Sequence, residues 1–563
     1  MTLVSSPVDD LAERFFTATL ERDPLTASVI GRHEYDGRLP DLSPEAAAAD
    51  RRTFQALRSE AEELSPDPGE PEEALTLSAI RSVADAELAW LEADPTSYTL
   101  DVTWGLQSSL LSMASYQPLR SPADGEAALS RWRSIAPTVD QQVANLRRGL
   151  AEGRTPIRDS AEKVAGQLRE ALAAAPEEDA LLIPIRERPV EGWADEAWRR
   201  FATELQRVVA DEARPALARL LDFVEREALP HGRSGEEAGL GSLPDGGELY
   251  ARLVRAETTT TLTPEAIHAT GLAEVERIDA EMAELGRRIL GTGSLAETQA
   301  ALRSDPRMHF ETAEQVVEVA ERSLARANEA VPAWFGRVPR TPCVVTPMLP
   351  HEEQHTTIAY YREPAADGSR PGRYYINTWQ PQTRPRYEAE ALAFHEAVPG
   401  HHLQIALAQE LPALPDFRRH ANLTGFIEGW GLYTERLGDE MGLYSGDLDR
   451  LGMLSFDAWR ACRLVIDTGM HAMGWSRARA IGFMLEHSAL AQNNIVNEVD
   501  RYLGRPAQAL AYKVGQLTIS RLRREAEERL GTAFDLRAFH DAVLGHGPLP
   551  LDTLAVAVES SLP

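Results

Sequence analysis

Residues 393–404 read A-F-H-E-A-V-P-G-H-H-L-Q and bring three of the chain's 14 histidines close together. The residues before them combine charged and apolar side chains at helical spacing, so His395 is expected on a helix. In H-E-x-x-H metallohydrolases, two histidines on one helical face bind zinc, and the glutamate is the general base for the attacking water. The stretch therefore predicts a metal-dependent hydrolase with Glu396 as its base.

The spacing departs from H-E-x-x-H because Pro399 and Gly400 come before the second pair of histidines. On a straight helix His401 would lie about 240° round from His395, and His402 within about 20° of it. That geometry favours His402 as the second ligand, although about 10.5 Å of helical rise is a long reach. Pro399 has no N–H to donate, so local unwinding is also expected, and a looped-out Pro-Gly pair would make His401 the ligand. Both alternatives stay open, with His402 preferred.

A third ligand is expected in residues 426–435, F-I-E-G-W-G-L-Y-T-E. Glu428 is a charged residue in an otherwise apolar and aromatic run, and a buried carboxylate is costly unless it is paired or bound to a metal. A catalytic zinc site uses three protein ligands and one open position. Glu435, two turns further on the same face, is expected either to orient a histidine or to lie on the surface.

Amide hydrolysis also needs a donor for the developing oxyanion, and substrate binding needs polar groups nearby. Tyr502, Tyr512 and His471 are the candidate donors. Arg501 and Lys513, each next to one of the tyrosines, are candidates for binding a substrate carboxylate. Each residue taken alone is more consistent with a structural role, and one of the set is expected to serve in the site.

The composition describes a soluble globular chain of 563 residues with a formal charge of −29. Such a charge repels phosphate backbones and anionic lipid surfaces, so neither nucleic acid nor a membrane is expected as a partner. Two cysteines give no disulfide framework and no thiolate metal site. The N-terminus lacks a secretory pattern, and no run approaches the roughly 18 apolar residues of a membrane span. These features predict a cytoplasmic location.

Helical periodicity dominates the first half of the chain and returns after residue 387. Ser43-Pro44 and Thr263-Pro264 are helix-start signals, with a capping hydroxyl followed by proline in the first turn. The glycine-rich residues 231–247 predict a surface loop. We expect helices over residues 9–22, 44–64, 73–93, 124–152, 160–174, 193–228 and 263–290.

Three short runs rich in β-branched and aromatic residues, 342–347, 356–361 and 373–378, precede the metal-site helix. They predict a small antiparallel sheet. A sheet edge in that position could hold an extended peptide by backbone hydrogen bonds, which makes Tyr374 and Asn377 candidate substrate-binding residues. Burial of the tyrosines inside the sheet is the alternative.

With these residues in view, the chain resembles the bacterial family catalogued as domain of unknown function 885. The signature H-E-x-x-P-G-H-H-x-Q stands at residues 395–404. Further similarity lies in L-P-D-G at Leu243, Y-Y-I-N at Tyr374, E-G-W-x-x-Y at Glu428, D-T-G-x-H at Asp467, R-Y-x-x-x-P-x-Q-A-L-x-Y-K at Arg501 and F-H-D-x-V-L at Phe539. The first 240 residues carry little of this signature.

That family looks like a distant relative of helical zinc peptidases shaped as two lobes around a deep channel, including the thermostable carboxypeptidase and angiotensin-converting types. The resemblance implies one zinc ion per chain, two histidines and a downstream glutamate as its ligands, and a late tyrosine that stabilises the tetrahedral intermediate. It also implies a mainly α fold in which residues 1–563 form one two-lobed catalytic unit. Within it, residues 1–240 are a mostly helical part, residues 241–563 hold the metal site, and the small sheet falls in 340–378.

The function predicted from these residues and this resemblance is zinc-dependent hydrolysis of peptide or peptide-like amide bonds in short substrates, as in a carboxypeptidase or dipeptidase. One alternative uses the same site on a non-peptide amide or ester. The other is an inactive clamshell that binds peptides without cleaving them.

Overall fold

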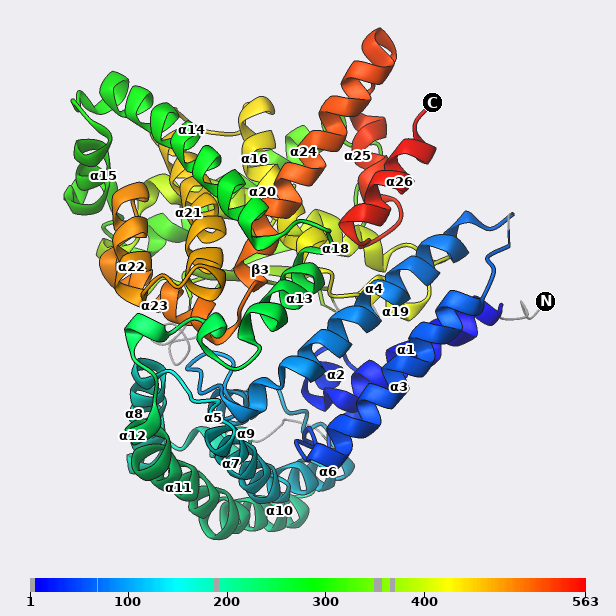
Figure 1. The fold of residues 1–563 in the computed structure, drawn as a ribbon, viewed down its shortest axis with the longest axis vertical. Helices are drawn as coiled ribbons and strands as arrows, with labels where there is room; N and C mark the ends of the chain where they lie inside the picture. The colour runs from blue at the N-terminus through cyan, green and yellow to red at the C-terminus, as the bar shows by residue number, and fades with distance from the viewer. Residues whose placement is uncertain (1–5, 68, 187–191, 349–356, 365–369) are drawn as a thin grey trace.

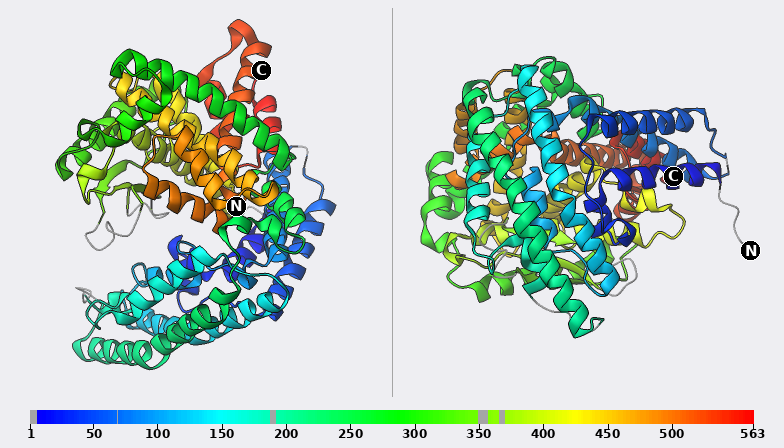
Figure 2. Two further views of the ribbon diagram at one scale, coloured as in Figure 1. Left: turned by 60° about the vertical axis from the view of Figure 1, so that its left-hand side comes forward. Right: turned by 90° about the horizontal axis from the view of Figure 1, so that it is seen from below.

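Helices make up most of the structure, a computed structural model that describes residues 6–67, 69–186, 192–348, 357–364 and 370–563. They gather into two lobes joined along one side, as the left-hand view of Figure 2 shows. Figure 1 traces the chain from the N-terminal helices through the lower lobe and back into the upper lobe. The mainly helical, two-lobed architecture expected from the sequence is confirmed.

The N-terminal helices pack with the C-terminal half of the chain. They are α1 (Pro7–Arg22), α2 (Pro24–Val29), α3 (Pro44–Glu63) and α4 (Pro71–Ala93). The Ser43 hydroxyl accepts a hydrogen bond from the Ala46 N–H, which confirms the predicted start of α3. Buried residues of these helices belong to the same apolar core as the chain from Ala238 onward. Residue 240 is therefore not where the core divides.

The lower lobe has an apolar core of its own, with buried residues between Leu100 and Ala228. The predicted helix over 124–152 is two helices, since the chain bends at Ser134. The predicted helix over 193–228 has π-helical turns before Pro215 and Pro230, because each proline lacks the N–H that would continue the α-helical pattern. The helices of this lobe are α5 (Leu106–Met113), α6 (Pro122–Arg133), α7 (Ile135–Ala151), α8 (Arg158–Ala173), α9 (Ile183–Arg186), α10 (Asp195–Val208), α11 (Arg214–Phe223) and α12 (Leu229–His231).

The upper lobe begins after the glycine-rich connection and contains the predicted metal-site helices. Thr263 caps α14 through a hydrogen bond from the Ala266 N–H, as its sequence predicts. The helices α14 and α21 run side by side, and so do α20 and α24. The helices before the sheet are α13 (Gly246–Thr258), α14 (Pro264–Leu290), α15 (Leu295–Ser304) and α16 (Ala313–Trp334). Those after it are α17 (Ala389–Glu396), α18 (His401–Gln409), α19 (Asp416–His420), α20 (Thr424–Glu440), α21 (Asp447–Ala472), α22 (Arg477–His487), α23 (Gln492–Gly504), α24 (Ala511–Leu530), α25 (Leu536–Leu544) and α26 (Leu551–Ser561).

The sheet is mixed rather than antiparallel. Its strands β1 (Cys343–Pro347), β2 (Ala359–Arg362) and β3 (Gly372–Ile376) have the order β1-β3-β2. The prediction is right for β2 and β3, which follow each other and pair antiparallel, and wrong for β1, which pairs parallel to β3. The reason is that β2 lies between them in sequence, so β1 and β3 run the same way when they become neighbours. Residue 356, the predicted start of the second run, lies outside the described residues.

Among the described residues, every helix is too short or too polar to cross a membrane.

Candidate metal centre

Three side chains from three helices converge in the upper lobe: His395 of α17, His401 of α18 and Glu428 of α20. The Glu428 Oε2 atom lies 3.6 Å from His395 Nε2 and 3.5 Å from His401 Nε2. The two imidazole rings are nearly perpendicular, with centroids 4.7 Å apart. We refer to these three residues as the His-His-Glu cluster.

The Pro-Gly pair creates this arrangement by breaking the helix. Helix α17 ends at Glu396 and α18 begins at His401. A Cβ on Gly400 would lie only 1.9 Å from the carbonyl oxygen of His395, so a side chain at this position would force the turn apart. The Trp430 indole N–H, on the helix that carries Glu428, donates to the Pro399 carbonyl at 3.0 Å. The turn therefore brings His401 to His395 and fixes both to α20.

His402 is not part of the cluster. Its ring accepts a hydrogen bond from the Tyr361 hydroxyl at Nδ1 (2.9 Å) and donates from Nε2 to the Thr341 carbonyl (3.0 Å). Burial lowers its pKa to about 4, so the ring is neutral and holds the sheet against α18. The preference for His402 as ligand assumed a straight helix and is corrected: the structure brings His401 to His395.

The spacing within the His-His-Glu cluster suits a divalent cation. Glu428 Oε2 and His401 Nδ1 are buried and have no hydrogen-bond partner among the described residues. Zinc binds histidine nitrogen and carboxylate oxygen at about 2.0–2.2 Å, so ligand atoms at tetrahedral angles lie about 3.3–3.6 Å apart. The observed separations of 3.5 and 3.6 Å match that range and are too long for strong hydrogen bonds. Two histidines and one glutamate are also a donor set of catalytic zinc sites.

Glu435 contacts the His-His-Glu cluster through His395. Its Oε1 accepts a hydrogen bond from His395 Nδ1 at 2.8 Å, which leaves Nε2 turned toward Glu428. Gly431, between the two glutamates, has no side chain to obstruct the ring, since a Cβ there would lie 2.8 Å from an imidazole atom. Of the two roles expected for Glu435, the structure shows the buried one, in contact with a histidine.

Glu396 is the last residue of α17 and is half-buried next to His395. No described residue hydrogen-bonds its carboxylate. The pKa of Tyr374 is raised by burial and further by the charge of Glu396, which places the carboxylate near that tyrosine. Glu396 is therefore a carboxylate directly after a cluster residue, with no hydrogen bond to any described residue.

Tyr512 approaches Glu428 from α24. Helices α20 and α24 meet closely because each has a glycine at the crossing: a Cβ on Gly429 would lie 2.5 Å from the Cα of Gly515. Burial raises the pKa of Tyr512, and the charge of Glu428 raises it further. Among the described residues its hydroxyl has no hydrogen-bond partner, so it is free to donate to another group.

Residues 24–558 match the sequence model of the family described as "Bacterial protein of unknown function (DUF885)". The chain belongs to the DUF885 family. The match includes most of the N-terminal part, where the sequence motifs alone showed little similarity.

Two solved structures share the fold of this DUF885 chain, and each is of a protein described as a "putative lipoprotein". The one from Colwellia psychrerythraea is 26% identical, with a TM-score of 0.90 and 98% of both chains covered. The one from Shewanella oneidensis is 17% identical, with a TM-score of 0.76, and 98% of this chain and 99% of that chain are covered. No curated protein matches the chain.

Tyr502 and His471, two of the predicted catalytic residues of this DUF885 protein, have other partners. The Tyr502 hydroxyl accepts from Arg463 Nε at 2.7 Å and donates to Glu498 Oε2 at 2.6 Å. His471 accepts from the Leu240 N–H at Nδ1 (2.9 Å) and donates from Nε2 to the Tyr502 carbonyl (3.1 Å). Burial lowers the pKa of His471 to about 3, so it stays neutral. Both residues hold backbone and side chains together, and their catalytic assignment is corrected.

Lys513 and Arg501, the two cations predicted to bind a substrate carboxylate, are each paired with carboxylates of the protein. Lys513 is 1% exposed, and its Nζ contacts Asp457 Oδ1 at 2.5 Å and Glu274 Oε2 at 3.0 Å. Arg501 is paired with Glu498 through two nitrogens and donates to the Gln508 side chain at 3.0 Å. Lys513 is therefore structural, and Arg501 is committed to a neighbouring carboxylate.

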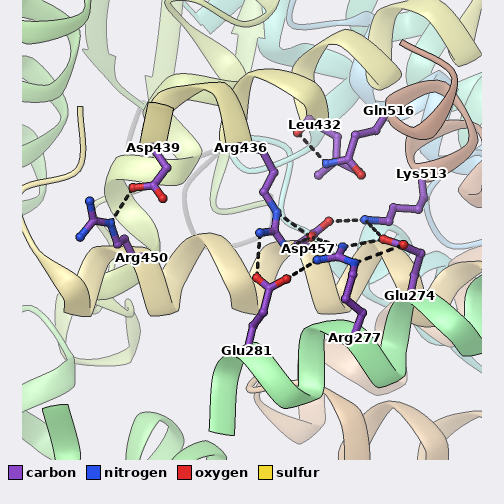
Figure 3. Close-up of polar contacts among 10 residues, drawn as sticks. All are labelled: Glu274, Arg277, Glu281, Leu432, Arg436, Asp439, Arg450, Asp457, Lys513 and Gln516. Carbon is purple, nitrogen blue, oxygen red and sulfur yellow. Dashed lines mark hydrogen bonds and ion pairs between the residues drawn. The ribbon is translucent and has the colours of Figure 1, made fainter. Parts of the chain in front are cut away.

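Lys513 belongs to a network of charges, buried at Lys513 and Asp457, that joins four helices of the upper lobe (Figure 3). Asp457 of α21 lies at its centre and also contacts Arg436 of α20 at 2.6 Å. Three cations face three carboxylates, so the network is neutral. We refer to it as the ion network; its members are Glu274, Arg277 and Glu281 of α14, Arg436 of α20, Asp457 of α21 and Lys513 of α24.

The two predicted substrate-binding residues of the sheet differ in their surroundings. Asn377 is buried, and its amide donates to the Thr357 carbonyl (3.1 Å) and accepts from the Trp379 N–H (3.0 Å). These bonds close the turn after β3, so the substrate role of Asn377 is corrected. Tyr374 is 1% exposed, with its ring inside the sheet region and near Glu396. Its ring is therefore buried near Glu396 rather than exposed at a sheet edge.

Sequence reasoning missed two arginines of α21. The Arg460 guanidinium stacks on Trp459 (4.4 Å to the ring centroid), and Arg463 lies 4.4 Å from the Tyr512 ring. Arg460 also lies 3.6 Å from Glu435 Oε1. The available signal was two cations three residues apart in a helix that is otherwise mostly apolar, which indicates buried charges on one face.

Proposed function

We propose that this protein is a zinc-dependent metallohydrolase that cleaves peptide or peptide-like amide bonds of short substrates, and that it is a distant relative of the helical zinc peptidases. One observation carries the proposal: Glu428 Oε2 is buried, has no hydrogen-bond partner among the described residues, and lies 3.5–3.6 Å from two imidazole nitrogens. A buried carboxylate left in that state is costly unless a cation joins the group.

In this proposal His395, His401 and Glu428 hold the ion, and Glu435 keeps His395 in the tautomer that presents Nε2. When bound, zinc supplies Lewis acidity, which polarises a carbonyl group and acidifies water. The tautomer matters because a proton on Nε2 would exclude the metal. Glu435 is therefore a positioning residue.

Glu396 acts as the general base and then the general acid. Its carboxylate takes a proton from the attacking water and returns it to the leaving amine, which a carboxylate without competing hydrogen bonds can do in both steps. Its place directly after His395 at the end of α17 puts it beside the site.

Tyr512 acts as the oxyanion donor. Its raised pKa keeps the hydroxyl protonated at neutral pH, and an uncommitted O–H in a partly buried site can stabilise charge on the substrate oxygen. The close crossing of α20 and α24 at Gly429 and Gly515 brings the two sides of the site together.

Metal analysis and a peptide digest test this proposal together. Purified protein should contain about one zinc per chain by elemental analysis and should cleave members of a mixed short-peptide library, read by mass spectrometry. Glu396→Gln should keep the metal and lose turnover by about a thousandfold or more, because it removes proton transfer but not a ligand. Glu248→Gln, at a carboxylate whose side chain is 83% exposed, is the matched control and should be unchanged.

Each contrary result has a defined meaning. Wild-type turnover in Glu396→Gln would exclude Glu396 as the base. If the protein binds metal and cleaves non-peptide amides or esters but no peptide, its substrate is a non-peptide amide or ester. Absence of bound metal would leave a peptide-binding clamshell as the remaining function.

A further inference from the structure

A second candidate site lies away from the His-His-Glu cluster, where the two apolar cores meet. It is a cavity of about 340 Å³, within the range of about 300–1,000 Å³ typical of small-molecule sites. One wall is the chain around α4 and α5, and the other is the turn after α23. Leu100 and Leu220 line it from the lower-lobe core, while Trp90 packs against the other core. We refer to it as the junction cavity.

Two tryptophans and one arginine dominate the junction cavity. Trp104 is 55% exposed, an unusually open position for so large an apolar ring. The Arg505 guanidinium carbon lies 5.9 Å from the Trp90 ring centroid and 5.4 Å from that of Trp104. A cation between two indoles offers a charged end and flat apolar faces to one ligand.

The guanidinium N–H groups of Arg505 are available to a ligand. Its one ion pair among the described residues is with Glu257 Oε1 at 3.7 Å, longer than a hydrogen bond, and that oxygen already accepts from the Trp90 indole N–H at 3.1 Å. The other arginine of the cavity, Arg22, is by contrast paired with Glu87 and lies 3.7 Å from Asp50. Arg505 is therefore the cation available to an incoming carboxylate, which its fork of N–H groups fits.

The walls of the junction cavity are fixed in relation to each other. Asp101 accepts hydrogen bonds from the backbone N–H groups of Thr103 (2.7 Å) and Trp104 (2.6 Å), which holds the loop that carries the exposed indole. Its other carboxylate oxygen packs against Gly504, where a Cβ would lie 1.9 Å away. The loop with Trp104 and the turn with Arg505 are thus in direct contact, which favours a site that is formed before a ligand arrives.

We propose that the junction cavity binds a small aromatic carboxylate, with its ring on the indoles and its carboxylate on Arg505. The site is separate from the metal centre and does not depend on the proposed hydrolase activity. An aliphatic acid would lose the ring contacts, and a neutral aromatic would lose the guanidinium.

Calorimetric titration of the full-length protein with three probes tests the proposal. Indole-3-acetate has both features, indole-3-ethanol lacks the charge, and cyclohexylacetate lacks the aromatic ring. We expect indole-3-acetate to bind about tenfold or more tightly than either of the others, the difference that one charge-assisted bidentate pair or one ring stack contributes. Equal affinity for indole-3-acetate and indole-3-ethanol, or no binding of indole-3-acetate at millimolar concentration, would overturn the proposal.

Variants assign the contacts. Arg505→Met keeps the aliphatic stem and should reduce indole-3-acetate to the affinity of indole-3-ethanol, whereas Trp104→Leu should reduce it to that of cyclohexylacetate. Arg322→Met, at an arginine of α16 whose side chain is 66% exposed, is the control and should bind as wild type does. Wild-type affinity in Arg505→Met would contradict the assignment.

A metal ion can also bind a carboxylate, so Glu428→Gln is titrated in parallel. Unchanged affinity in that variant is expected, because the ligand sits in the junction cavity. Loss of binding would place the probe on the His-His-Glu cluster and overturn the proposal, whatever the outcome for hydrolysis.

Discussion

Two groups of charged residues, the ion network and the His-His-Glu cluster, share helix α20, and they differ in how their charges are satisfied. In the ion network, Asp457 contacts Lys513 at 2.5 Å and Arg436 at 2.6 Å, and cations and carboxylates balance. In the His-His-Glu cluster, Glu428 Oε2 and His401 Nδ1 have no hydrogen-bond partner among the described residues. A polar group that stabilises a fold is expected to be satisfied by the fold itself, whereas one that binds a ligand keeps an atom free for it.

The largest expected effect comes from breaking the cluster itself. His401→Ala should abolish stoichiometric zinc binding and turnover, because two ligands do not hold a catalytic zinc tightly. His402→Ala should retain the metal, since that ring bonds Tyr361 and Thr341 instead. Elemental analysis of both purified variants measures how much zinc each one retains. Zinc retained in His401→Ala and lost in His402→Ala would reverse the ligand assignment.

Tyr512→Phe removes a hydroxyl that has no hydrogen-bond partner among the described residues and leaves the three candidate metal ligands in place. We expect kcat to fall by about 10²–10³-fold, the usual loss for one oxyanion donor, with metal content and thermal stability unchanged. Tyr502→Phe is the matched control. Because the Tyr502 hydroxyl is bonded to Arg463 and Glu498, its loss should lower stability instead. Steady-state kinetics with thermal melts separate the two, and an unaltered kcat in Tyr512→Phe would remove it from the mechanism.

Asp457→Asn breaks the ion network at its centre. Lys513 and Arg436 would lose their shared carboxylate, and breaking a buried ion pair costs about 3–5 kcal/mol. Denaturant unfolding measures the change. The double variant Asp457→Leu with Lys513→Met removes a charge of each sign and should recover part of the loss. If the single variant were as stable as wild type, the network would have no structural role.

A pH dependence of stability is expected from Asp467, a structural carboxylate with one oxygen that has no hydrogen-bond partner among the described residues. Burial raises its pKa to about 7, and the Tyr250 hydroxyl and the Ala507 N–H donate to one of its oxygens. Between about pH 4 and 7 the folded state keeps this proton and the unfolded state has lost it. The contribution to stability is therefore present at low pH and is lost as pH rises toward 7, by up to about 1.4 kcal/mol per pH unit.

Asp467→Asn should remove that slope, because the amide does not titrate. Denaturant unfolding at several pH values, compared with wild type, measures it. A slope that is the same in both proteins would show that another group is responsible.

The sequence predicted those features of the fold that depend on local chemistry. The starts of α3 and α14 follow from a hydroxyl and a proline in adjacent positions, and both are confirmed. The parallel pairing of β1 with β3 was not predictable in the same way, because it depends on the order of the strands in the finished sheet, where β2, which lies between them in sequence, is at the edge.

The candidate site was predictable to the extent that a charge in an apolar run indicates a special environment. That signal found Glu428, but it applied equally to Lys513, whose partner Asp457 lies on another helix. The choice between His401 and His402 depended on the shape of a two-residue turn. The geometry of that turn is set by a contact with Trp430, which no local pattern reveals.

The glycines of α20 have a consequence for any attempt to move this site to another protein. Gly429 and Gly431 each weaken a helix by about 1 kcal/mol relative to alanine, yet one admits α24 and the other admits the ring of His395. The segment is therefore a poor helix by itself and takes its shape from the neighbours it makes room for. A graft of residues 395–402 and 428–433 alone would remain unformed, whereas a graft of α17, α18, α20 and α24 as one block would carry its own scaffold.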